Sequence, residues 1–183
     1  MISKLYRKIF KEIDILNSKI RIIHLKLKYP NIIIKGTTYI ARNCEITCVD
    51  GGTMILNNAH INYGSFIFCA KNAKLNIENS YIGMNAVIVA VTKIIKKNNC
   101  EIAEMAVIRD QNHKHNLTDT PISKQGYKSA PIIINENVWI GAKATILKGV
   151  EIGKNSIIGT NAVVNKSFPS SSIIVGVPAK KIK

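Results

Sequence analysis

Two histidines, His113 and His115, stand in a polar stretch of the chain and could move protons. A histidine side chain has an ordinary pKa of about 6.5, so it is largely neutral at pH 7 and can accept a proton from a hydroxyl group. The other two histidines, His24 and His60, stand outside any motif and read as structural or surface residues. The polar stretch from 109 to 131 is therefore the first place to look for a site.

This stretch interrupts a strict six-residue repeat. Six is not a multiple of the helical period of 3.6, and the repeat lacks the turn residues that mark hairpins. It fits a solenoid in which each coil has three short strands and every sixth residue points into a shared triangular core. The aliphatic residues that carry the repeat are Ile134, Ile140, Ile146, Ile152, Ile158 and Val164.

Small or β-branched residues follow four positions later, and glycines directly follow three of the aliphatics. We expect the small residues to fit the corners and the glycines to form turns with positive φ. The glycines are Gly141, Gly153 and Gly159. The same period occurs less regularly upstream, in groups such as Ile34, Ile40 and Ile46 or Ile55, Ile61 and Ile67. We therefore predict one repeat domain over 31–183, with an extruded loop at 109–131 and a C-terminal tail at 168–183.

The first thirty residues form a separate amphipathic segment. Between residues 3 and 28, apolar residues recur every three or four positions with lysines opposite, which predicts a helix. Residues 22–29 look more extended, and Pro30 ends the segment. The helix could cap the open end of the solenoid, whose edge would otherwise aggregate, or it could contact a membrane surface through its basic residues.

Composition limits the functional classes. The chain has 26 Lys and Arg against 11 Asp and Glu, a formal net charge of +15, which suggests an anionic partner unless base composition alone explains it. The absence of a nucleic-acid-binding motif argues against DNA or RNA. Four cysteines without a CxxC pair suggest free thiols in a reducing cytoplasm, and no segment resembles a signal peptide or a membrane span.

Two motifs resemble the hexapeptide-repeat acyltransferases. The run NENVWIGAKATILKGVEIGKNSIIGTNAVV (135–164) and the closing GVPAKKIK (176–183) resemble the galactoside, maltose and xenobiotic O-acetyltransferase branch. DQNHKH (110–115) with PISKQG (121–126) resembles the branch that acts on surface and capsular polysaccharides. The resemblance implies an all-β fold, a left-handed parallel β-helix, that assembles as a homotrimer with active sites between subunits. It also implies acetyl-CoA as donor, a sugar hydroxyl as acceptor and no metal.

The resemblance assigns roles to individual residues. His113, in the pair with Asn112 that precedes Pro131 by the family's distance, matches the general base, and His115 is the second candidate. Asn116 stands where relatives often have Asp, so Asp110 is a candidate to orient the imidazole. Trp139 matches the wall of the acceptor site, and loop position adds Tyr127 and Lys114 as acceptor contacts. The cofactor positions that match are Gly141, Ala142 (whose N–H would stabilise the oxyanion), Thr160, Ala162, Lys166 and Lys180.

Three other functions remain open at this point. An N-acetyltransferase acting on an amino sugar could use the same base. A zinc enzyme of the carbonic anhydrase type could use the same fold, but it needs three imidazoles around the metal. A nucleic-acid-binding module would use the basic surface. O-acetylation of a sugar, in a surface or capsular polysaccharide or its precursor, remains the first expectation.

Overall fold

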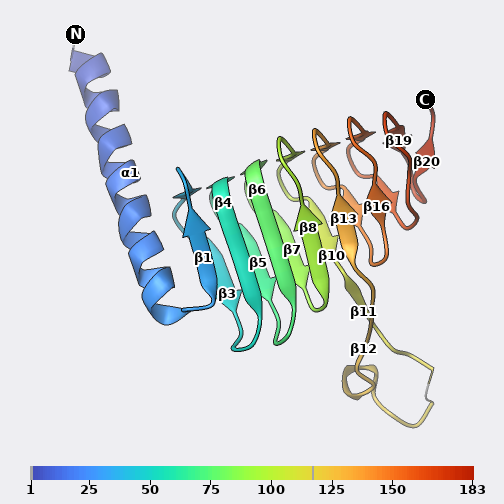
Figure 1. Ribbon diagram of the computed structural model, residues 1–183. Helices are drawn as coiled ribbons and strands as arrows, with labels where there is room; N and C mark the ends of the chain where they lie inside the picture. The colour runs from blue at the N-terminus through green and yellow to red at the C-terminus, as the bar shows by residue number, and fades with distance from the viewer. Residues whose placement is uncertain (1, 117) are drawn as a thin grey trace.

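The computed structural model describes residues 2–116 and 118–183. Short strands stack coil on coil into a long prism, with a helix across one end and a loop hanging from one edge (Figure 1). Strands of successive coils pair in parallel and in register, as Cys48 with Cys69 or Ile140 with Ile158. The fold is the left-handed parallel β-helix that the resemblance implied.

The coils build three flat faces. The first face and the second face share the long strands that bend across a corner, so they are hydrogen-bonded into one sheet, whereas the third face is a separate sheet. The first face holds β1 (Ile32–Lys35), the first parts of β4 (Thr53–Ile61) and β6 (Lys74–Ile82), then β8 (Lys93–Lys96), β13 (Ile132–Ile134) and β16 (Glu151–Ile152). The second face holds β2 (Tyr39–Ile40), the last parts of β4 and β6, then β9 (Glu101–Ile102), β14 (Trp139–Ile140), β17 (Ile157–Ile158), β19 (Ile173–Val175) and the antiparallel β20 (Lys180–Lys181). The third face holds β3 (Glu45–Cys48), β5 (Phe66–Cys69), β7 (Val87–Ala90), β10 (Val107–Arg109), β15 (Thr145–Ile146) and β18 (Val163–Val164).

The predicted row of aliphatic residues forms the core. All six members from Ile134 to Val164 have no exposed surface, and Ile174 extends the row. Upstream the predicted phase is wrong in places. Ile34 and Ile55 are only half buried, whereas Met54 and Leu56 point inward. The phase changes there because the neighbouring coil corners differ in length, so a fixed count of six does not locate the inward residues.

The glycines have a different role from the one that we expected. Gly141, Gly153 and Gly159 do not have positive φ, and a Cβ at Gly153 would lie 2.2 Å from the backbone nitrogen of Ser170. They permit close approach between coils instead. Most of the non-glycine residues with positive φ are asparagines, such as Asn137 with φ 56°. Asparagine tolerates this conformation because its short polar side chain can bond locally; here Asn137 Nδ2 donates to Asn155 Oδ1 of the next coil at 2.9 Å.

Helix α1 (Ile2–Lys28) caps the first coil. The expectation that residues 22–29 are extended is wrong: the helix continues to Lys28, and the N–H of Tyr29 donates to the carbonyl of Leu25 at 2.8 Å. Helical geometry persists because Ile22 and Leu25 pack against the core at the end of the prism. Nearby, the backbone N–H of Ile40 donates to the Ser18 hydroxyl at 2.8 Å, which joins the helix to the first coil.

Candidate active site

A two-stranded antiparallel ribbon carries the histidine motif. β11 (Gln111–His113) pairs with β12 (Tyr127–Ser129), and the short 3₁₀ helix η1 (Ile122–Lys124) lies in the loop between them. The ribbon leaves the prism after β10 on the third face, and the chain returns to the first face at β13 (Figure 1). It projects from the edge between these faces, so its side chains are accessible from solvent.

Asp110 anchors the root of the ribbon. Its carboxylate is fully buried and accepts hydrogen bonds from the backbone N–H groups of Val91, Thr92 and Lys93 at 2.7–2.8 Å. The backbone carbonyl of Asp110 accepts a bond from the N–H of Ala130 at 3.0 Å, which closes the base of the ribbon. Asp110 was a candidate to orient His113, but the carboxylate is engaged with these N–H groups. The carboxylate therefore joins the root of the ribbon to the turn at 91–93.

His113 stands on the ribbon opposite Tyr127. The two residues are register partners, and their ring centroids lie 4.6 Å apart with a tilt of 53°. Both side chains are exposed, and no hydrogen bond holds the imidazole among the residues that the structure describes. The Tyr127 ring therefore contacts one side of the imidazole, and the rest of the imidazole is open to solvent.

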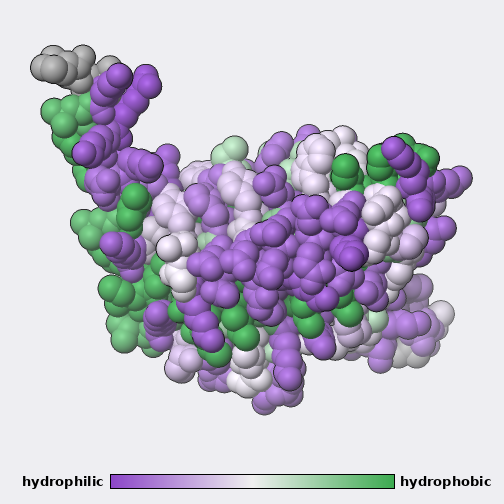
Figure 2. Space-filling view, turned by 45° about the horizontal axis from the view of Figure 1, so that its top comes forward, coloured by the Kyte–Doolittle hydropathy of each residue, from purple (hydrophilic) through white to green (hydrophobic). Residues whose placement is uncertain are grey.

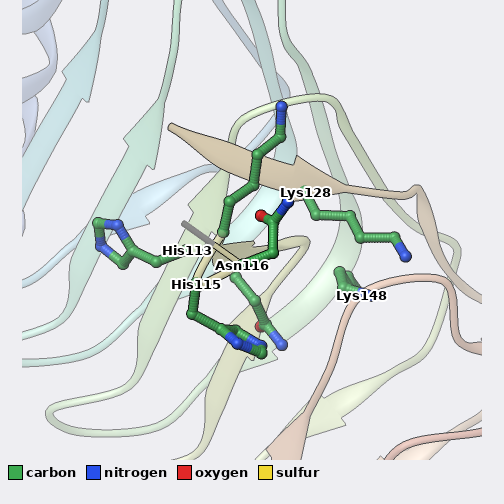
Figure 3. A pocket seen from close by; sticks show the side chains of 7 residues that line it. His113, His115, Asn116, Lys128 and Lys148 are labelled. Carbon is green, nitrogen blue, oxygen red and sulfur yellow. The ribbon is translucent and has the colours of Figure 1, made fainter. Parts of the chain in front are cut away.

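A hollow of ≈ 550 Å³ opens beside the ribbon, and both histidines line it. Three lysines, Lys114, Lys128 and Lys148, share its walls with Asn112 and Asn116, and no acidic side chain of the described residues does. In the view of Figure 3, the imidazole of His113 points away from that of His115 and from Lys148. The lysines therefore give the hollow a positive charge. The two histidines that are candidate general bases point in different directions from the ribbon.

The sequence reasoning missed Lys128 and Lys148. Lys128 faces the hollow because it is the register partner of Asn112, and Lys148 reaches it from the coil after the loop. No sequence signal distinguishes these two from the many other lysines, because only the fold brings them to the histidines.

A second hollow, of ≈ 450 Å³, lies on the third face, and Tyr127 of the ribbon lines it. Phe66 and Phe68 line it together with Val89 and Arg109. The two phenylalanine rings are parallel within 6°, with centroids 6.5 Å apart. Alternation around the buried Ile67 could have revealed these outward aromatics. The face beside the ribbon is thus apolar, whereas the ribbon itself is basic.

Trp139 lies elsewhere in the chain. It stands on β14 of the second face, 52% exposed, in a shallow hollow with residues such as Glu101 and Asn155. The outward direction that the sequence predicted for the indole agrees with this exposure. Within one chain, however, Trp139 and His113 line different hollows on different sides of the prism. A single subunit does not bring them together.

The residues matched to cofactor binding lie in the last coils. Gly141 is buried, and a Cβ there would lie 2.8 Å from the carbonyl of Ile158, so its first role is close packing. Ala142 is half buried at the following turn. Thr160 is exposed, but Ala162 is fully buried in the core, so its side chain cannot line a channel.

The two matched lysines lie near the C-terminus and are exposed. Lys166 Nζ lies 5.7 Å from the ring centroid of Phe168. Lys180 belongs to β20, whose backbone pairs with Val175. Both ammonium groups are free to meet an anion outside the prism, and neither lines the hollow that contains the histidines.

Other titratable groups lie outside the ribbon. His60 stacks between Tyr39 and Tyr81 at 4.7 and 5.3 Å, and burial lowers its pKa. The four cysteines are free, and burial raises the pKa of the Cys69 thiol to about 12. Within 2–116 and 118–183, no three His, Cys, Asp or Glu side chains are grouped to hold a metal ion. No helix of the described chain is long and apolar enough to cross a membrane.

Comparison with known proteins supports the architecture. Residues 131–166 match the family model described as bacterial transferase hexapeptide (six repeats). A probable acetyltransferase of Mycobacterium tuberculosis is 26% identical over 178 residues, which cover 89% of this chain and 55% of the relative. WbbJ of Escherichia coli, whose name assigns it to O-acetyl transfer in lipopolysaccharide biosynthesis, is 28% identical over 163 residues, 80% of this chain and 82% of WbbJ.

A solved structure shares the fold. A point mutant of AntD, an N-acyltransferase from Bacillus cereus in complex with dTDP and coenzyme A, superimposes with a TM-score of 0.73. The match covers 86% of this chain and 87% of AntD at 22% identity. The repeat, the prism and these relatives all support placing the chain among the hexapeptide-repeat acyltransferases.

Proposed function

We propose that the protein is an acetyltransferase that moves an acetyl group from acetyl-CoA to a sugar hydroxyl, with His113 as general base. The observation that carries this proposal is the exposed imidazole on a ribbon that the buried Asp110 carboxylate fixes to a hexapeptide-repeat prism. The acceptor that we propose is a surface or capsular polysaccharide or its precursor, and the name of WbbJ supports this class.

The chemistry follows from a neutral imidazole. A ring nitrogen of His113 takes the proton of the acceptor hydroxyl while its oxygen bonds to the thioester carbonyl carbon. The oxyanion that forms needs a preorganised donor, and the backbone N–H of Ala142 is our candidate. The carbon–sulfur bond then breaks, the imidazolium returns its proton to the departing thiolate, and the products are a sugar acetate ester and free coenzyme A.

The charge of the hollow suits such ligands. Lys114, Lys128 and Lys148 line it without an acidic neighbour, so an anionic group of donor or acceptor is attracted. Lys166 and Lys180 are our candidates for the phosphates of coenzyme A, and Thr160 is our candidate contact along the pantetheine arm. Ala162 can contribute only through its backbone, because its side chain is buried.

We propose that the active unit is a homotrimer. His113 and Trp139 lie on different sides of one chain, so a site that uses both needs a neighbouring subunit. A prism with three flat faces offers a surface for this packing, and the apolar hollow with Phe66 and Phe68 next to the ribbon is available for it. We propose the cytoplasm, where acetyl-CoA is made, as the location.

Substitution of the base is the direct test. We expect His113→Ala to lower kcat about 10²–10⁴-fold, because this is the usual contribution of a general base. Release of free coenzyme A with a panel of sugars and oligosaccharides measures the turnover. His115→Ala is the matched control, since it changes an imidazole in the same hollow, and it should retain most activity. If His115→Ala loses activity while His113→Ala keeps it, the base is His115.

N-acetylation of an amino sugar is the second candidate, because AntD, an N-acyltransferase, shares the fold. The two reactions give different products. An ester is cleaved by neutral hydroxylamine, whereas an amide resists it. Products that resist hydroxylamine and form only from amino sugars would replace O-acetylation with N-acetylation as the function.

A further inference from the structure

Helix α1 has two apolar sides, and only one of them is covered. The inner side packs on the first coil through Ile22 and Leu25, with Ser18 buried between helix and prism. Arg21 Nε also donates to the carbonyl of Ile40 at 2.9 Å. The Tyr39 hydroxyl also donates to the Asp14 carboxylate. The cap therefore uses the inner side of the helix, from Asp14 to Leu25.

The outer side is an exposed apolar stripe along the whole helix. Its members recur at intervals of three or four residues, and between 46% and 81% of each side chain is exposed. They are Leu5, Ile9, Ile13, Leu16, Ile20, Ile23 and Leu27, and Tyr6 and Phe10 widen the stripe at its beginning. Figure 2 shows hydrophobic side chains, in green, along the edge of the helix that faces away from the prism. Ile23 lines a hollow of ≈ 650 Å³ between the helix and the first coil. The rest of the stripe has no partner outside the helix among the described residues, although its burial would be favourable.

The charges beside the stripe are basic. The helix holds eight Lys or Arg and two acidic residues. Lys8, Lys19 and Lys26 follow one flank of the stripe at helical spacing, and Lys28 lies on the other flank. Long basic side chains beside an apolar stripe can reach the phosphates of a lipid surface while the stripe enters the acyl region.

From this arrangement we propose that α1 docks the protein on an anionic lipid bilayer, with the helix lying in the plane of the surface. The helix crosses the end of the prism, so its outer side forms an end of the molecule, and no other described helix or strand projects beyond it (Figure 1). The attraction of each basic residue to an anionic surface, together with the apolar stripe, suffices for reversible binding.

A second copy of the helix is the alternative occupant, because the same spacing suits a coiled coil. Charge disfavours it. In a coiled coil, side chains of opposite charge at the positions flanking the apolar stripe normally stabilise the pairing of the two helices. Here that flank carries Lys19 and Lys26 but only one acidic residue, Glu12. Two helices with a large excess of positive charge repel each other, and an anionic bilayer attracts each of them.

Vesicle sedimentation with the full chain tests this inference. We expect binding to vesicles of equimolar phosphatidylcholine and phosphatidylglycerol, and much weaker binding to phosphatidylcholine alone. The triple variant Lys8→Gln, Lys19→Gln, Lys26→Gln should lower the partition coefficient about 100-fold. The matched control Lys71→Gln, Lys154→Gln, Lys181→Gln makes the same change of net charge on the prism and should stay within about threefold of the native protein.

A second variant tests the apolar stripe. Leu16→Ser with Ile20→Ser changes two exposed side chains that leave the cap intact, so thermal unfolding should be nearly unchanged while vesicle binding is lost. Equal loss in both lysine variants, or equal binding to neutral vesicles, would overturn the proposal. Failure of the native protein to bind any vesicles would also overturn it. If, in addition, the serine variant formed a smaller oligomer than the native protein, the stripe would be a contact with a second copy of the chain. The proposal does not depend on acetyl transfer, because α1 contributes no residue to the candidate site.

Discussion

Asp110 and Lys96 are both buried charged side chains, but their surroundings differ. The Asp110 carboxylate accepts three backbone N–H groups, which is the arrangement that makes a buried charge stable. Lys96 points into the core of the prism from β8, and its ammonium group has no hydrogen-bond partner among the described residues. Burial lowers the pKa of Lys96 to about 8. Asp110 therefore holds the ribbon in place, whereas Lys96 costs stability when it is charged.

Replacement of Lys96 should stabilise the protein. The unfolded chain binds a proton at Lys96 up to pH 10.5, whereas the folded chain releases it above about pH 8. Keeping Lys96 charged in the core therefore lowers the free energy of unfolding. This loss is complete below pH 8 and disappears as the pH rises to 10.5. We expect Lys96→Met to be more stable by about 3 kcal/mol at pH 7, with the difference shrinking through that window. Urea unfolding of both proteins across this range measures it, and a difference that does not change with pH would contradict the assignment.

The coils stack closely because particular turn residues allow it. Asparagines supply the left-handed turns, and their side chains form ladders along an edge, as Asn58 Nδ2 donates to Asn79 Oδ1 at 2.8 Å and Asn79 Nδ2 to Asn98 Oδ1 at 2.7 Å. Glycines occur where the backbone of the next coil leaves no room for a Cβ. The element that matters for function, the β11–β12 ribbon, depends on this stacking because the turn bonded by Asp110 lies on the preceding coil.

A methyl group at Gly153 tests the close approach. Its Cβ would lie 2.2 Å from the Ser170 nitrogen and 2.5 Å from the Pro169 carbonyl carbon, both backbone atoms that cannot move independently. We expect Gly153→Ala to lower the free energy of unfolding by about 3 kcal/mol. Gly126→Ala is the control: it has φ +77° but no atom within 4 Å, and it should cost about 1–2 kcal/mol from backbone strain alone. Equal costs in the two variants would mean that backbone conformation, and not coil spacing, explains Gly153.

At the scale of the whole molecule, the candidate site is divided between faces. The basic hollow with His113 lies at the edge between the third and first faces, and Trp139 lies on the second. In a ring of identical prisms, one subunit's edge meets a different face of the next, which is a heterologous contact. Such a ring would place an imidazole from one chain beside an indole from its neighbour.

Mixed oligomers test this division. His113→Ala and Trp139→Ala should each be nearly inactive alone. When the two are denatured together in equal amounts and refolded, roughly a quarter of the sites of a random trimer contain both native residues, and about that fraction of native activity should return. Recovery is measured as coenzyme A release against native protein treated in the same way. No recovery, with oligomers correctly formed, would place both residues in one chain's site or remove Trp139 from it.

The sequence by itself determined the prism and the candidate base. The aliphatic residues from Ile134 to Val164 recur every six residues, and all of them must point into one continuous core. A coil with three sides of equal length meets this condition. The motif around His113 marked the extruded segment, since polar residues there broke an otherwise regular pattern. Local spacing was enough for these conclusions because, in the coils after the loop, it fixes which side chains face inward.

Tertiary structure alone decided what surrounds those residues. Lys148 lines the same hollow as His113. The Asp110 carboxylate, a candidate to orient the imidazole, accepts hydrogen bonds from three backbone N–H groups instead. Trp139 lies on a different face of the prism from the ribbon. The tertiary structure also decided that α1 covers the prism with one side and leaves a second apolar side free. A repeat states which residue points inward, but not which coils lie next to each other once a loop leaves the prism. Contacts between residues distant in sequence depend on that stacking, which the pattern along the chain does not contain.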